Sequence, residues 1–310
     1  MGYFIGHSDI INSFKKRAVN NSLSHAHLIV GVDGIGKSKL AKVFALQILN
    51  GVDTREYVDI INYRPKKLSF GVDEVRELIA EVGKKPFEGN KKVIIVHEGN
   101  KLTIQAQNAL LKTIEEPPSG VFIIILCESL ELILDTIKSR CQIYKLTPLS
   151  KSEIREYIRN IKNNATEEEI LASLAYSEGV PGRAERFLTD NNLQKLRELL
   201  LDVLAEANNG AADVLLRYEN LLLSYKDNKD EIFNILTSLI RDIMVYKELN
   251  DTSLIINGDK IAQLKKLAIG MSYKKLNKIL DKIREARVNL LSNSNFIITI
   301  RVMLIGFMEV

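Results

Sequence analysis

Eight residues near the N-terminus have the types and spacing of a phosphate-binding loop. Gly31 to Ser38 read GVDGIGKS, which matches the pattern GxxxxGK[ST]. In such a loop the glycines turn backbone N–H groups toward an anion, a lysine reaches the β and γ phosphates, and a hydroxyl binds Mg²⁺. We therefore expect Lys37 to contact the phosphates of ATP or ADP and Ser38 to be the Mg²⁺ ligand. A glycine-rich strand-to-helix turn without a ligand is the alternative.

A second strand must end in acidic side chains beside this loop if a metal ion and a water are to be positioned. The apolar run at residues 92–96 (KVIIV) is the one candidate, and it ends in His97-Glu98. Glu98 is the candidate for orienting or activating a water. His97 is a poor substitute for a carboxylate because Mg²⁺ prefers hard oxygen ligands. We expect nucleotide binding with slow or absent hydrolysis by this chain alone, although a loop histidine without a role explains His97 equally well.

Short apolar runs alternate with helical stretches around these motifs. The runs that predict strands are residues 25–30, 59–63, 92–96 and 121–126. The stretches that predict helices are residues 39–49, 72–82 and 103–115. This order predicts an α/β fold with a parallel sheet covered by helices on both faces.

The strand pattern stops after Pro148, and the rest of the chain has helical periodicity. Three short helices are expected at residues 151–161, 166–177 and 182–189, followed by longer helices from 193 onward. We therefore predict three domains. They are an α/β phosphate-loop domain at residues 1–148, a three-helix lid at 149–191 and an all-α domain at 192–310.

Composition narrows the class of protein only slightly. The chain has 310 residues, 26% of them charged, and a net charge of +4, which suits nucleic acid, an acidic partner or neither. Two cysteines without a CxxC pair predict that there is no zinc module. No signal peptide and no run of ~18 apolar residues stand out, so we expect a cytoplasmic protein without a membrane span.

Three further motifs resemble those of the AAA+ clamp-loader ATPases. They are NALLKTIEEPP at residues 108–118, Ser139-Arg140-Cys141, and GVPGR at residues 179–183. The chain is similar over essentially its whole length to the delta-prime type, the non-motor subunits of the bacterial DNA polymerase III clamp loader. The resemblance implies an AAA+ core, a helical lid over the nucleotide, and a helical collar that holds five subunits in a ring.

The resemblance also implies roles for individual residues. Arg140 would be an arginine finger that enters the ATP site of a neighbouring subunit. Ile5 and Gly6 would lie near the adenine, and Arg183 would face this chain's own nucleotide from the lid. The alternatives are a surface ion pair for Arg140 and a packing role for Arg183. The expected nucleotide-binding positions are Ile5, Gly6, Gly31, Gly34, Ile35, Gly36, Lys37, Ser38, Lys39 and Arg183.

The implied partners are the gamma/tau and delta subunits and, through them, the sliding clamp and primer-template DNA in replication. Two departures bear on catalysis: His97 replaces the metal-orienting aspartate, and Cys127-Glu128 stands where the first sensor would offer a hydroxyl or amide. These departures favour the non-motor subunit over an ATP-hydrolysing gamma/tau-type motor, which remains the alternative. A DNA-binding protein with a vestigial fold is a third hypothesis. Polymerase activity is not expected of this chain because no acidic pair is placed for two-metal chemistry.

Overall fold

The structure is a computed structural model, and it describes residues 4–52, 54–67, 69–209, 212–292 and 294–308. The contacts divide the chain into two compact units. The first comprises Met1–Tyr157 with Gly179–Gly182, and the second comprises Ile158–Glu178 with Arg183–Val310. The first unit contains the sheet, and the second is helical.

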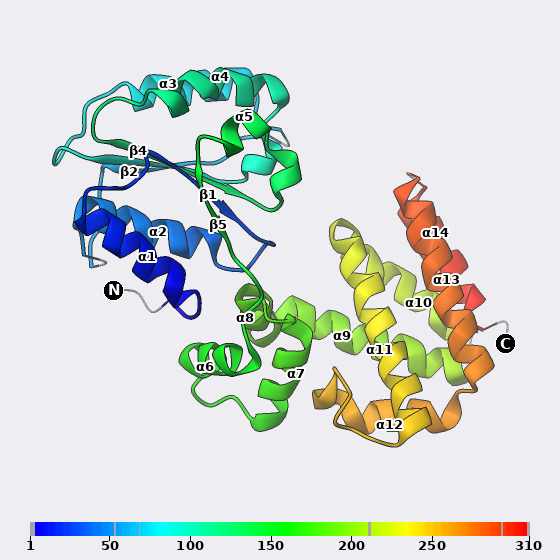
Figure 1. Cartoon of the computed structure of the whole chain (residues 1–310). Coiled ribbons are helices and arrows are strands. Elements are labelled where there is room, and N and C mark those ends of the chain that lie inside the picture. The colour runs from blue at the N-terminus through cyan, green and yellow to red at the C-terminus, as the bar shows by residue number, and fades with distance from the viewer. Residues whose placement is uncertain (1–3, 53, 68, 210–211, 293, 309–310) are drawn as a thin grey trace. The chain divides into compact units, whose positions relative to one another are not determined.

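A five-stranded parallel sheet forms the centre of the first unit (Figure 1). Its order is β2 (Ile60–Tyr63), β3 (Lys92–Val96), β4 (Val121–Cys127), β1 (Ala26–Val30) and β5 (Gln142–Lys145). The three central strands are fully buried, as their predominantly apolar sequences predict. Val30 is paired with Cys127 and Val96 with Ile125, so β1 and β3 end at the same edge of the sheet. The predicted α/β fold with a parallel sheet is confirmed.

Helices cover both faces of this sheet (Figure 1). The helices α1 (Ser8–Val19) and α2 (Lys37–Leu49) lie on one face, and α3 (Val72–Val82), α4 (Ile104–Glu115) and α5 (Asp135–Lys138) lie on the other. Each face has its own hydrophobic core. Short 3-10 turns, η1 (Gly99–Lys101) and η2 (Leu130–Leu132), follow β3 and β4.

The sequence analysis did not predict α1. Its first residue follows His7, which has a left-handed φ of 52° and makes no side-chain cap, so the usual start signal is absent. What holds α1 is tertiary packing, because Phe14 is fully buried and stacks on Phe44 of α2 with 3.7 Å between ring centroids.

Every element after β5 in the described part of the chain is helical, beginning with α6 (Lys151–Ile161). The elements that follow are α7 (Glu167–Ser177), α8 (Pro181–Thr189), α9 (Asn191–Asn209), α10 (Ala212–Leu223), η3 (Lys226–Asn228), α11 (Lys229–Leu249), η4 (Gly258–Lys260), α12 (Ile261–Gly270), α13 (Tyr273–Leu291) and α14 (Phe296–Gly306). Thr166 caps α7 in a capping box with Glu169, as a threonine followed by glutamates predicts. Among the described residues, no helix combines the length and the apolar composition that crossing a membrane requires.

A buried arginine joins several of these helices in the second unit. Arg197 of α9 is 1% exposed and donates to both carboxylate oxygens of Asp259, at 2.8 and 2.9 Å, and to Asn257 at 3.0 Å. Its guanidinium also lies 4.4 Å from the ring centroid of Phe187 in α8. A buried charge is tolerated only when it is paired in this way, so the contact fixes how α8, α9 and η4 pack.

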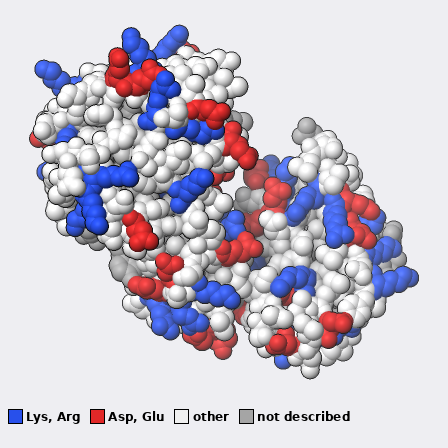
Figure 2. Space-filling view, viewed as in Figure 1, with Lys and Arg blue, Asp and Glu red and all other residues white. Residues whose placement is uncertain are grey.

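Lysine and arginine alternate with aspartate and glutamate over the face shown in Figure 2. Some charged side chains of the first unit are paired with neighbours three residues away in the chain, as in the Arg76–Asp73 and Lys84–Glu81 pairs. Charges of both signs are therefore mixed on this face.

Candidate nucleotide site

The phosphate loop connects the end of β1 to the start of α2. Gly34 and Gly36 have left-handed φ angles of 78° and 108°, which a glycine adopts without strain. The N–H of Gly31 donates to the carbonyl of Cys127 at 3.2 Å, which ties the loop to β4. The start of α2 therefore presents backbone N–H groups and the positive end of a helix dipole, as the motif predicts.

Lys37 is bonded to the loop itself. Its ammonium donates to the carbonyls of Gly31 at 2.7 Å and Val32 at 3.0 Å. Burial lowers the pKa of Lys37, and the nearby carboxylates of Asp33 and Glu128 offset part of that effect. A phosphate that enters the loop therefore replaces these two carbonyls as the partner of the ammonium.

Ser38 and His97 face each other across the site. The Oγ of Ser38 lies 3.4 Å from Nδ1 of His97, and Nε2 of the same ring lies 2.8 Å from Oδ1 of Asn62 in β2. Burial lowers the pKa of His97 to about 4, and the positive charge of Arg64 acts in the same direction. The ring is therefore uncharged at neutral pH, and this geometry has Nε2–H donating to Asn62 while Nδ1 accepts from the Ser38 hydroxyl.

Glu98 forms an ion pair with Lys101, three residues later in the chain. Glu98 has a left-handed φ of 53°, and its side chain is 40% exposed. The acidic group that could orient a water is thus engaged with a lysine. Glu128 is exposed at the end of β4, where its charge acts on Lys37, and the adjoining Cys127 is a buried thiol whose pKa burial raises to about 11.

The N-terminal segment packs beside the loop. A Cβ on Gly36 would lie 3.4 Å from the ring of Phe4, which sequence reasoning did not single out. Gly6 has a φ of 78°, and a Cβ there would lie 2.3 Å from Leu149. The expected adenine-side residues Ile5 and Gly6 therefore belong to a segment that contacts the loop through its neighbour Phe4.

Two other predicted positions make contacts of a structural kind. The side chain of Ile35 is 2% exposed and belongs to the core beneath the loop. The ammonium of Lys39 donates to the hydroxyl of Tyr157 at 2.9 Å and lies 5.1 Å from the centroid of that ring. Ile35 is therefore available to a nucleotide through its backbone alone.

The GVPGR motif also reaches the phosphate loop, through a backbone contact. The N–H of Gly182, at the start of α8, donates to the carbonyl of Gly34 at 2.9 Å. A Cβ on Gly182 would lie 2.8 Å from the Cα of Gly34, so only glycine permits this approach. Sequence reasoning placed Gly182 in a family motif but did not assign it this contact.

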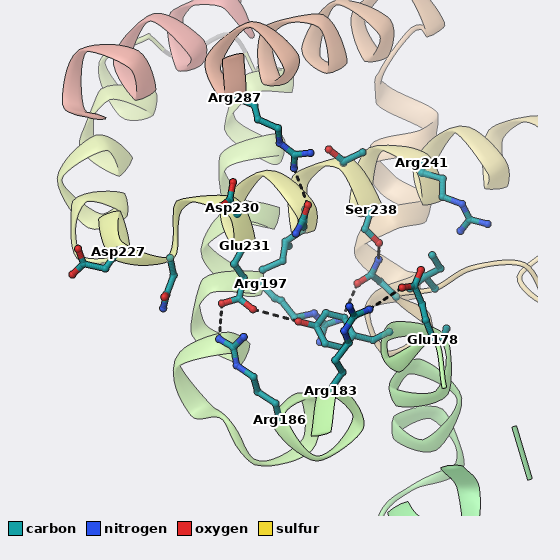
Figure 3. A pocket seen from close by; sticks show the side chains of 18 residues that line it. Glu178, Arg183, Arg186, Arg197, Asp227, Asp230, Glu231, Ser238, Arg241 and Arg287 are labelled. Carbon is teal, nitrogen blue, oxygen red and sulfur yellow. Dashed lines mark hydrogen bonds and ion pairs between the residues drawn. The ribbon is translucent and has the colours of Figure 1, made fainter. Parts of the chain in front are cut away.

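Arg183 lies in the second unit, on the wall of a cavity of about 800 Å³ (Figure 3). Its guanidinium donates to Glu178 at 2.9 Å. The same cavity is lined by Arg186, which is paired with Glu231, and by Arg287. The role of Arg183 over the nucleotide stays a prediction.

Arg140 follows α5 at the surface of the first unit. Its Nε lies 2.6 Å from Oε1 of Glu115 at the end of α4, and its Nη1 donates to the carbonyl of Thr136 at 2.9 Å. The two charged side chains are 41% and 42% exposed. Glu115, whose charge had no specific role in the sequence analysis, is thus the ion-pair partner of Arg140.

Two family models match this chain. The one described as DNA polymerase III, delta subunit, matches residues 6–150, and the one described as DNA polymerase III, delta subunit, C terminal, matches residues 191–307.

The chain is similar to several replication proteins. It is 24% identical to the DNA polymerase III subunit delta' of Bacillus subtilis, over 92% of this chain and 90% of that protein. It is 34% identical to the replication factor C small subunit of Haloarcula marismortui, over 54% of this chain and 49% of that protein. The chain spans about half or less of the length of several of the curated relatives it matches.

A solved structure shares the fold. The DNA polymerase III gamma subunit-related protein of Thermotoga maritima superposes with a TM-score of 0.52 at 16% identity, over 96% of this chain and 98% of that one. Together with the two family models, which cover the sheet domain and the C-terminal helices, these matches agree with the phosphate loop and the motifs around it. The chain belongs to the AAA+ clamp-loader family, in its DNA polymerase III delta-prime branch.

Proposed function

We propose that the chain is the non-motor subunit of a DNA polymerase III clamp loader and helps to load the sliding clamp onto primed DNA. The observation that carries the proposal is His97. Its uncharged ring stands at the end of β3 and contacts Ser38, at the position where the resemblance implies a metal-orienting aspartate. The loop retains its phosphate-binding elements but lacks that carboxylate, so the chain itself is a weak or inactive ATPase that binds ATP or ADP.

The proposed contribution of the chain to catalysis is Arg140, acting on the ATP of a neighbouring subunit. Arg140 is held by Glu115 in an exposed ion pair. Exposed pairs contribute about 0.2–1 kcal/mol, so releasing the guanidinium costs little. The pair with Glu115 therefore does not prevent transfer of the guanidinium to a phosphate, which binds it more strongly.

Replacing the arginine tests this role in the assembled loader. We expect Arg140→Ala to lower DNA-stimulated ATP hydrolysis, because an arginine finger supplies on the order of 10³-fold or more at the site it completes. The measurement is single-turnover phosphate release by the loader assembled with wild-type or variant chain.

Two neighbouring residues provide controls. Lys138→Ala removes a cation from α5 that is paired with Asp135, and Glu115→Gln removes the partner of Arg140 while keeping the arginine. Both should leave the rate close to that of wild type. An unchanged rate in Arg140→Ala would overturn the finger. Mg²⁺-dependent turnover by the purified chain that disappears in Lys37→Ala would favour the gamma/tau-type motor instead.

The proposed partners are the gamma/tau and delta subunits, bound through the helical collar at residues 192–310. Helix α14 supports binding through the collar because apolar side chains lie on its exposed face as well as on its packed face. Ile300, Met303 and Leu304 are buried against other helices, while Ile298, Val302 and Ile305 are 42–60% exposed and share one face at i, i+4 and i+7. A neighbouring subunit that covers this face would bury it, and clamp and DNA would be reached through that assembly.

A further inference from the structure

The phosphate loop of this chain fits a phosphate but not Mg²⁺. A metal ion in such a loop is held by the loop hydroxyl and a carboxylate from the adjoining strand. Here the Ser38 hydroxyl faces Nδ1 of His97, and Nε2 of the same ring is used by Asn62. Mg²⁺ selects oxygen ligands in octahedral geometry, and an imidazole that is fixed on both sides offers none.

The phosphate-binding part of the site is intact. Gly34 and Gly36 have the left-handed backbone that turns N–H groups toward an anion, and Lys37 lies beside them. In a phosphate loop these groups contact phosphate oxygens directly, so none of their contacts requires a divalent cation.

The charge at residue 97 decides whether nucleotide binding requires Mg²⁺. A carboxylate at the end of β3 would repel the extra negative charge of metal-free ATP, and Mg²⁺ relieves that repulsion. The ring of His97 is 4% exposed and contacts Ser38, and unlike a carboxylate it carries no negative charge, so this repulsion is missing. Of the other carboxylates nearby, Glu98 is paired with Lys101, and the charges of Asp33 and Glu128 favour the protonated form of Lys37, the form that binds phosphate.

We infer that this loop binds nucleoside triphosphate or diphosphate equally well with and without a divalent cation, and that the contact of His97 with Ser38 and Asn62 removes the requirement for Mg²⁺. The inference rests on the proposed nucleotide site and adds its ligand form. A subunit that hydrolyses little ATP would then still use its intact loop, to hold nucleotide whether or not Mg²⁺ accompanies it.

The test is to titrate the purified full-length chain with a fluorescent ATP analogue, once in EDTA and once in excess Mg²⁺. We expect dissociation constants that agree within about twofold, because the cation gains no protein ligand. A wild-type affinity that is at least about tenfold higher in Mg²⁺ would overturn the inference.

Two substitutions at residue 97 separate charge from shape. His97→Asp should weaken binding in EDTA and restore it in Mg²⁺, whereas His97→Asn, which is polar but uncharged, should bind equally in both. Circular dichroism verifies that each variant is folded. If His97→Asp does not fold, His97→Asn still tests the inference. Lys37→Ala should lose binding in both conditions. Absence of any wild-type binding would overturn the inference while leaving the role of Arg140, measured in the assembled loader, to be judged separately.

Discussion

Two histidines of the sheet domain are buried without a positive charge. Burial lowers the pKa of His27 and of His97 to about 4, from an ordinary value of 6.5. His27 is fully buried among Phe14, Phe44 and Tyr144, with its Nδ1 3.4 Å from the Tyr144 hydroxyl. Both side chains therefore contribute to the packing of the sheet domain, whatever their role in a binding site.

This burial makes stability depend on pH in a defined window. Each ring is neutral in the folded protein and takes up a proton on unfolding when the pH is below 6.5, so the unfolded state binds more protons there. The free energy of unfolding should be constant above pH 6.5 and fall toward pH 5 by about 1.4 kcal/mol per pH unit for each histidine. Urea titrations of the full chain between pH 5 and 7.5 measure the slope.

A variant identifies the groups responsible. His27→Gln should reduce the slope, whereas His25→Gln, at an exposed position next to the same strand, should leave it unchanged. The window lies above the range in which most carboxylates titrate. A wild-type slope of zero between pH 5 and 6.5 would show that the two rings are not buried as neutral groups.

At the level of elements, a pair of glycines joins the start of α8 to the phosphate loop. Gly182 and Gly34 approach so closely that a Cβ on Gly182 would lie 2.8 Å from the Cα and 2.9 Å from the carbonyl oxygen of Gly34. The obstacle is backbone, which cannot move aside as a flexible side chain would. The backbone of Gly182 thus packs directly against the backbone of the loop that is proposed to bind phosphate.

Adding one methyl group should separate these elements. We expect Gly182→Ala to destabilise the first unit by about 1–3 kcal/mol, as overpacking does, and to weaken ATP binding by displacing the loop. Thermal unfolding and nucleotide titration measure the two effects. Gly89→Ala is the matched control because nothing lies within 4 Å of the added Cβ. Equal behaviour of the two variants would mean that the contact between Gly182 and Gly34 is not tight.

At the level of the whole molecule, the proposed assembly requires a surface for other subunits. The exposed face of α14 carries Ile298, Val302 and Ile305, and it is the kind of apolar face that a partner covers in an oligomer. On the same helix Arg301 forms a bidentate pair with Glu219 of α10, at 2.7 and 2.8 Å, which anchors the helix independently of that face.

A charge on this face should prevent assembly without unfolding the chain. We expect Val302→Lys to weaken association with gamma/tau and delta subunits by about tenfold or more, since a lysine at the centre of an apolar contact must be desolvated. Analytical ultracentrifugation of the mixed subunits measures assembly. Leu171→Lys on α7, where the leucine is 53% exposed, is the control and should assemble normally. Normal assembly of Val302→Lys would place the interface elsewhere.

Local patterns in the sequence were enough to predict the phosphate loop, the parallel sheet and the position of His97 at the end of a central strand. These features depend on residue type and short spacing: glycines where the backbone must turn, uninterrupted apolar runs where a strand is buried on both faces, and prolines where α4 must end. Helix α1 escaped this reasoning because its start is uncapped and its stability comes from the stacking of Phe14 on Phe44.

Tertiary structure alone decided the partners of the site residues. Nothing in the spacing of Asn62 and His97, or of Glu115 and Arg140, predicts that these side chains meet, because each pair is joined only when separate elements pack. The same holds for Gly182 and Gly34, which are 148 positions apart in the chain. The sequence thus determined which chemistry is present, while long-range packing determined that His97 is held neutral against Ser38 and that Arg140 is displayed at the surface.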